Sequence, residues 1–126
     1  TDVQIVWDLC HYGWPRGLDI WSPIFVERFA SYCAAAARVI GAASPAPAIY
    51  CPVNEISYWA WAGAHAGLMD PAVRGRAGEL KRQLVRAAIA GMRAIKLVDP
   101  NARFASAEPL INVSFEQANK REEALS

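Results

Sequence analysis

Three short apolar runs, separated by two longer segments with helical periodicity, constrain the fold of this chain more than any other feature. Residues 3–10 (VQIVWDLC), 48–53 (AIYCPV) and 103–113 (RFASAEPLINV) are rich in β-branched and aromatic residues and too short for helices, so each is expected to be a strand. In residues 22–41 and 79–98, apolar side chains recur every three or four positions, which is typical of amphipathic helices. This alternation of strands and helices predicts an α/β fold with a parallel sheet and right-handed crossovers.

The expected helices carry boundary signals of their own. Ser22 is a good N-cap, Pro23 suits the first helical position, and Gly41 is a suitable stop signal. Residues 56–78 should form a long loop that begins with a short helical turn, and the polar tail, residues 114–126, could be helical or frayed. The second helix is expected to bury a face made of Leu80, Leu84, Ala88, Met92 and Ile95.

The composition argues against several classes of function. With 126 residues the chain is one domain at most, and its net charge of +1 leaves no electrostatic footprint for nucleic acid or an anionic membrane. No apolar run reaches the roughly 18 residues that a membrane helix needs. The three cysteines lack the even number and tight spacing of a disulfide framework, so we expect free buried thiols and a cytoplasmic location.

Polar side chains follow each of the three predicted strands. In α/β proteins with parallel strands, the carboxyl ends of the strands carry the ligand-binding groups. The residues at these ends are Asp8 and His11, then Asn54 and Glu55, then Glu108 and Asn112. This coincidence moves Glu55 from the class of ordinary surface charges toward that of site residues.

The segment YCPVNEISYWAW sets an Asn-Glu pair directly before a cluster of large aromatic side chains. Sugar rings stack their apolar faces on aromatic rings, and a carboxyl group in partly apolar surroundings can hold a proton near neutral pH and protonate a glycosidic oxygen. The Asn54 amide could donate to a sugar 2-hydroxyl, a contact that strengthens in the transition state. From spacing alone, Glu55 could equally be an ordinary glutamate at the start of a loop. The aromatic residues are Tyr58, Trp59 and Trp61.

The runs VWDLCHYGWP and YCPVNEISYWAW, separated by a helix that begins SPIFVERFASYC, resemble glycoside hydrolase family 1 and its relatives in clan A. In that clan an Asn-Glu pair closes the fourth strand of a (β/α)8 barrel. The resemblance implies that Glu55 is the general acid/base, that Asn54 contacts the 2-hydroxyl of the sugar and that His11 binds the glycone. Tyr58 and Trp59 are expected to contribute to substrate binding.

The resemblance covers most of residues 3–113, with two departures. The family usually reads Asn-Glu-Pro, whereas Ile56 follows Glu55 here, and His11 follows the WDL run instead of preceding it. A complete barrel takes roughly 250 residues, so residues 1–126 are expected to be a partial TIM-barrel catalytic domain that covers about strands 3 to 5 with their helices. A retaining glycosidase needs a second carboxylate about 5 Å from the first, which clan A supplies at the seventh strand, so this chain alone is expected to be inactive.

The sequence therefore predicts a β-glucosidase-like glycoside hydrolase that cleaves β-O-glycosides by a retaining mechanism and needs no cofactor. The alternative is a carbohydrate-binding or pseudoenzyme barrel without turnover. A metal site can be drawn from Cys10, His11, Cys51 and Glu55, but their spacing matches no zinc pattern, and we expect no metal. The expected partner is a carbohydrate substrate, with no nucleic acid and no membrane.

Overall fold

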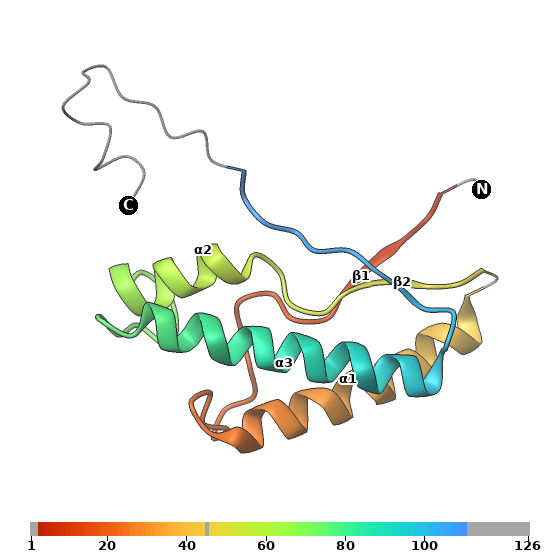
Figure 1. Ribbon diagram of the computed structural model, residues 1–126, viewed down its shortest axis with the longest axis horizontal. Helices are drawn as coiled ribbons and strands as arrows, with labels where there is room; N and C mark the ends of the chain where they lie inside the picture. The colour runs from red at the N-terminus through yellow and green to blue at the C-terminus, as the bar shows by residue number, and fades with distance from the viewer. Residues whose placement is uncertain (1–2, 45, 111–126) are drawn as a thin grey trace.

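The computed structural model describes residues 3–44 and 46–110, in which a small parallel sheet is covered on one face by helices (Figure 1). Its strands are β1 (Val6–Asp8), β2 (Ile49–Cys51) and β3 (Arg103–Phe104), which lie in the order β1-β2-β3. Both pairings are parallel, so the three carboxyl ends meet at one edge of the sheet.

Two long helices, α1 (Pro23–Ala43) and α3 (Ala77–Val98), make the crossovers between the strands. A short helix, α2 (Ile56–Trp61), follows β2 and continues into a π-helical turn, η1 (Ala62–Ala66). Figure 1 shows α1 and α3 lying together against the sheet, with α2 beyond its carboxyl edge. A helix, and not the long loop expected from the sequence, therefore begins directly after Glu55.

The start of α1 follows its sequence signal, but its end does not. The Ser22 hydroxyl accepts a hydrogen bond from the Ile24 amide at 3.2 Å, as expected of an N-cap. Gly41 does not stop the helix, which runs on to Ala43. The backbone turns extended at Ser44, where the following proline in the sequence disfavours helical geometry.

The strands are shorter than the apolar runs that predicted them. Regular pairing covers the middle of the first two runs but only the first two residues of the third, Arg103–Phe104. Single hydrogen bonds continue the pairing beyond these strands, such as Leu9 N to Cys51 O at 3.0 Å and Ala105 N to Tyr50 O at 2.9 Å. The expected end of the third strand at residues 111–113 and the tail at residues 114–126 lie outside the described residues.

The contact between α1 and α3 forms much of the core. Each helix presents a row of residues spaced by four positions, which places their side chains on one face. On α3 the prediction is confirmed for Leu80, Leu84 and Ile95, which are buried. The buried face also includes Gln83, Ala87 and Gly91, whereas the predicted Ala88 and Met92 are only partly buried. On α1 the buried row is Phe25, Phe29, Cys33 and Ala37, and on α3 the buried residues are Leu80, Gln83, Leu84, Ala87, Gly91 and Ile95.

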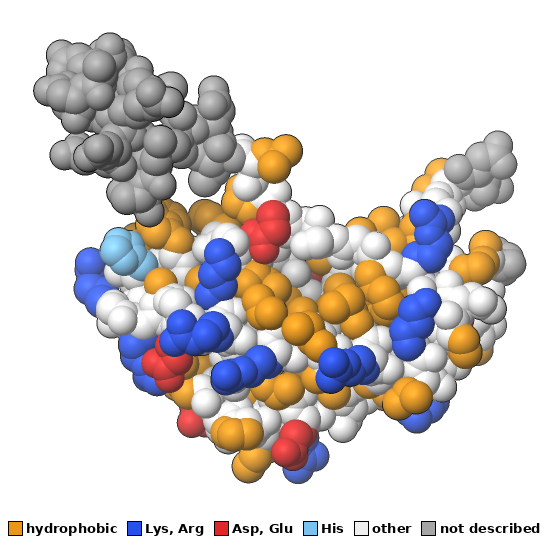
Figure 2. All heavy atoms as spheres, viewed as in Figure 1, with side chains coloured by type: hydrophobic (Ala, Val, Ile, Leu, Met, Phe, Trp, Pro, Cys, Tyr) orange, Lys and Arg blue, Asp and Glu red, His pale blue; other side chains and the backbone are white. Residues whose placement is uncertain are grey.

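Small and polar residues in the α3 row have specific partners. A Cβ atom at Gly91 would lie 2.9 Å from the Cys33 sulfur, so the absence of a side chain lets the helices approach. The amide of Gln83 donates to the carbonyls of Ile20 at 3.0 Å and Ser22 at 2.8 Å, which ties α3 to the loop that precedes α1. The outer face of α3 carries the Lys and Arg side chains that gather in Figure 2.

The expectation of a (β/α)8 barrel fragment is wrong for this structure. The described residues form an open sheet of three strands, with β1 and β3 at its edges, together with α1, α2 and α3. Alternating strand and helix patterns specify parallel neighbours, but closure into a barrel depends on strand number, tilt and stagger, which no local pattern encodes. The α/β class itself is compatible with the structure. Within the described residues, no helix combines the length and apolar character required to cross a membrane.

Replacing Gly91 with alanine should destabilise the protein. The new Cβ must displace the buried Cys33 sulfur and the Phe29 ring, and the cost of about 1–3 kcal/mol for overpacking exceeds the roughly 1 kcal/mol gained in helix propensity. Gly41→Ala is the matched control, because nothing lies within 4 Å of its Cβ position, and it should stabilise by about 0.5 kcal/mol. The measurement is the free energy of unfolding in urea for both variants. The packing would be contradicted if Gly91→Ala proved more stable than Gly41→Ala.

Candidate active site at the carboxyl edge of the sheet

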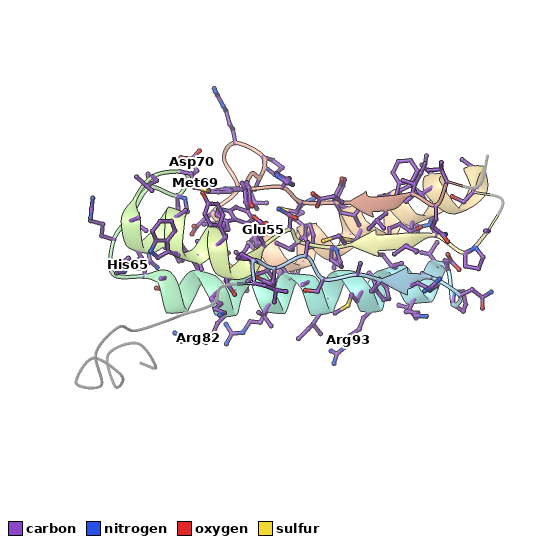
Figure 3. The ribbon with its side chains drawn as sticks, turned by 90° about the horizontal axis from the view of Figure 1, so that it is seen from above. Glu55, His65, Met69, Asp70, Arg82 and Arg93 are labelled. Atoms are coloured by element: carbon purple, nitrogen blue, oxygen red, sulfur yellow. The ribbon has the colours of Figure 1, made fainter. Side chains whose placement is uncertain are left out.

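Backbone hydrogen bonds on both sides hold the Asn54-Glu55 pair at the carboxyl edge of the sheet. The Asn54 amide donates to the Cys10 carbonyl beyond β1, and the Glu55 amide donates to the Ala107 carbonyl beyond β3, each at 2.9 Å. Figure 3 shows Glu55 at the junction between the sheet and α2. The two neighbouring segments thus fix the backbone from which the Glu55 side chain extends.

Two residues at this edge have a left-handed backbone that is uncommon outside glycine. Tyr12 has φ 62°, and Glu55 has φ 44° and ψ 58°. A non-glycine residue in this region costs of order 1–3 kcal/mol and persists only where the surroundings enforce it. Both residues belong to the same contact, so the strain is concentrated where two side chains are brought together.

That contact is a chain of three polar groups. The Tyr12 hydroxyl donates to Oε2 of Glu55, and the same hydroxyl accepts a hydrogen bond of 3.1 Å from Nδ2 of Asn54. All three side chains are half-buried. Burial, followed by the hydrogen bond to the Glu55 carboxylate and by its negative charge, raises the pKa of Tyr12 to about 12. The phenol therefore keeps its proton, and remains a donor to Glu55, at neutral pH.

His11 lies next to this chain and is oriented by Asp8. Its Nδ1 is 2.6 Å from Oδ2 of Asp8, while Oδ1 of the same carboxylate accepts from the Cys10 amide at 3.3 Å. Because a carboxylate only accepts, Nδ1 must carry the proton in this contact, which leaves Nε2 facing away from Asp8 as the second polar atom of the ring. The His11 side chain is 60% exposed, so this nitrogen is available to a ligand hydroxyl.

The predicted aromatic residues divide into a buried support and an exposed surface. Trp59 is fully buried, and its indole N–H donates to the Asp70 carbonyl at 2.8 Å, so it lies under the site and packs against the Tyr12 ring. Tyr58 and Trp61 are 36% and 48% exposed, with ring centroids 5.9 Å apart. Of the two aromatics predicted to bind substrate, only Tyr58 presents surface to a ligand.

The loop that holds Trp59 packs closely on η1. A Cβ atom at Gly63 would lie 2.7 Å from the Asp70 carbonyl oxygen, which is the same oxygen that accepts from the Trp59 indole. Glycine at this position is therefore what allows the loop to reach the indole. In Figure 3, Asp70 and Met69 lie at the end of the molecule that α2 and η1 form, away from the sheet.

Glu108, which also follows a predicted strand, has a structural partner. Its two carboxylate oxygens lie 3.2 and 3.3 Å from the Ser57 amide, in the first turn of α2. A negative charge at this position satisfies a free amide and favours the helix dipole. Glu108 therefore stabilises the start of the helix that follows Glu55, and Asn112 lies outside the described residues.

The metal site that can be drawn from the sequence is not supported by the cysteines. Burial raises the pKa of Cys10 to about 11 and also raises the pKa of Cys51, so both free thiols stay protonated at neutral pH. Among residues 3–44 and 46–110, no group of three or more His, Cys, Asp or Glu side chains is arranged to hold a metal ion.

Tyr12 is the site residue that sequence reasoning missed. The parallel order of the strands places the segment after β1 beside the segment after β2, so an aromatic hydroxyl next to His11 was a candidate neighbour of Glu55. Its left-handed backbone could not be foreseen, because tyrosine, unlike glycine or asparagine, does not favour that conformation.

The contact between Tyr12 and Glu55 predicts a change in titration. In Glu55→Gln the negative charge is lost, so the pKa of Tyr12 should fall from about 12 toward its usual value near 10, with the share due to burial remaining. NMR of protein labelled at tyrosine Cζ resolves the four tyrosines, and Tyr12→Phe assigns the signal. Glu108→Gln is the control and should leave the Tyr12 midpoint in place; an equal fall in both variants would contradict the contact.

Comparison with known proteins leaves the family of this chain open. No protein-family model matches the sequence, and searches of curated proteins and of solved structures also return no match. The resemblance to glycoside hydrolase family 1 therefore remains a prediction from the sequence, and the argument for function depends on the geometry of the site.

Proposed function

We propose that this protein contributes the general acid/base of a glycoside hydrolase that cleaves β-O-glycosidic bonds with retention. One observation carries the proposal: the Glu55 carboxylate, half-buried at the carboxyl edge of the sheet, is held by the Tyr12 hydroxyl and lies beside Asn54. A positioned carboxyl group next to an amide is the arrangement that protonates a glycosidic oxygen while a sugar hydroxyl is bound.

The proposed reaction has two steps. First, the Glu55 carboxyl gives its proton to the glycosidic oxygen as the bond from C1 to that oxygen breaks, and the bonding electrons stay on the departing alcohol. A second carboxylate, supplied from outside the described residues, bonds to C1. Water then attacks C1 and gives a proton to Glu55, and the second carboxylate leaves with its electron pair, which restores both groups.

Groups around Glu55 suit a sugar ring. Asn54 uses one N–H for Tyr12, which leaves its second N–H and its carbonyl oxygen for a 2-hydroxyl. His11 offers Nε2 to a further hydroxyl of the glycone. Tyr58 and Trp61 offer exposed ring faces for the apolar side of the sugar, and the buried Trp59 supports Tyr12 from below.

A second candidate is carbohydrate binding without turnover. The exposed pair of Tyr58 and Trp61 favours it, because stacking on two neighbouring rings can hold a sugar with no second carboxylate present. The two candidates share the ligand class and differ only in whether Glu55 transfers a proton. For either, we propose the cytoplasm as the compartment, since Cys10, Cys33 and Cys51 are all free thiols.

The acid/base proposal predicts a dependence on the leaving group, to be measured in a form of the protein that includes the second carboxylate. In Glu55→Gln, kcat/KM for alkyl or 4-nitrophenyl β-glycosides should fall by about 10²–10⁴-fold, because the departing oxygen needs a proton. For a 2,4-dinitrophenyl glycoside, whose leaving group needs none, kcat/KM should change by less than about tenfold, and azide should raise kcat by trapping the intermediate.

Glu108→Gln serves as the isosteric control and should retain activity on both substrates. If Glu55→Gln lowered kcat/KM equally for both glycosides, the acid/base assignment would be wrong. If the wild-type protein with its second carboxylate present binds sugar but hydrolyses none of these glycosides, the binding role replaces the proposal.

The exposed rings predict an effect on sugar affinity. Trp61→Ala should weaken binding of a β-linked disaccharide by about tenfold, or roughly 1.4 kcal/mol, because a stacking face is removed. Tyr58→Ala should act in the same direction. Tyr32→Ala on α1 removes a similarly exposed ring, 49% accessible, and should leave the affinity unchanged when measured by titration calorimetry.

A further inference from the structure

We propose that Tyr12 is a positioning residue that assigns different tasks to the two oxygens of Glu55, with Oε2 a permanent acceptor and Oε1 the atom that carries the catalytic proton. This inference rests on the proposed acid/base function and extends it. It concerns which oxygen faces the glycosidic bond, which the proposed function leaves unspecified.

The direction of the hydrogen bonds carries the argument. The Asn54 amide nitrogen can only donate, so the Tyr12 oxygen must accept from it. The single hydroxyl proton of Tyr12 is then directed to Oε2 of Glu55, and Oε2 must accept it. A protonated Glu55 can satisfy this chain only with its own proton on Oε1, so the donor atom of the acid is determined by groups that never touch the substrate bond.

Neighbouring aromatic rings restrict the orientation of the Tyr12 side chain. Its ring is surrounded by His11, Tyr58 and Trp59, with centroids 4.5, 5.7 and 6.0 Å away. The left-handed backbone at both Tyr12 and Glu55 fixes the two side chains toward each other. The high pKa of the phenol, about 12, means that the donor is present throughout the pH range in which a carboxyl group acts as an acid.

Asn54 connects this arrangement to the substrate. The amide of Asn54 uses one N–H to hold the Tyr12 oxygen, and its second N–H and its carbonyl oxygen have no hydrogen-bond partner among the described residues. Hydrogen bonds in a chain polarise one another, so a hydroxyl bound at Asn54 would strengthen the bond from Tyr12 to Oε2. The side chains that recognise the sugar and the acid therefore act through one connected path.

The test removes only the hydroxyl, with Tyr12→Phe, and compares it with Tyr32→Phe on α1, which removes an exposed tyrosine hydroxyl outside the site. For a 4-nitrophenyl glycoside, Tyr12→Phe should lower kcat/KM by about tenfold, while a 2,4-dinitrophenyl glycoside should lose less than twofold, because only the proton donor is misplaced. Tyr32→Phe should leave kcat/KM unchanged for both glycosides.

A double variant separates positioning from general damage to the fold. In a Glu55→Gln background, Tyr12→Phe should have almost no further effect on kcat/KM, because it acts through Glu55. The positioning role is overturned, and the acid/base role stands, if Glu55→Gln shows the leaving-group pattern but Tyr12→Phe either lowers kcat/KM equally for both glycosides or adds its full loss in the double variant. Absence of hydrolysis in the wild-type protein with its second carboxylate present overturns the proposed function and this inference with it.

Discussion

The arrangement of the site depends on the pairing of residues 54 and 55 with both neighbouring segments. Asn54 and Glu55 donate their backbone amides to Cys10 on one side and Ala107 on the other, so the sheet continues as single hydrogen bonds beyond its last ladder pair. Placement by backbone leaves the side chains free for chemistry. It also makes the site depend on all three strands at once, because loss of either neighbour would release one side of the pair.

The stability of the sheet in turn depends on helices that approach closely on one face. Gly91 lets α3 reach Cys33 on α1, and Gln83 connects α3 to the loop that precedes α1. The sheet itself is small, with strands of two or three residues, so most of the buried apolar surface comes from the helix pair and its contact with β2. The helix pair α1 and α3 thus forms the scaffold, the site lies at the carboxyl edge of the sheet, and β2 contacts both.

Local patterns predicted the order of the elements, the parallel pairing, the cap at Ser22 and the position of Glu55 at a strand end, because these follow from side-chain spacing and residue preference. The patterns failed for barrel closure, because closure depends on distant strands. They also failed for the end of α1, because that end depends on the proline that follows Ser44 in the sequence, outside the periodic segment. They also missed Tyr12, since its partner is 43 positions away and its backbone is unusual for its residue type. What the sequence could not supply was long-range geometry.

The backbone conformation of Glu55 is one that a proline at position 56 would disfavour. The motif of the resembled family has proline after the glutamate, and a proline would hold the preceding residue in an extended conformation, with ψ near 120–160°. Glu55 has ψ 58°, and Ile56 opens α2 at the helical position where proline would otherwise be welcome. An Asn-Glu-Pro sequence and this Asn-Glu-Ile sequence would therefore aim the same carboxylate in different directions, so the residue after the glutamate works as a conformational selector for the motif.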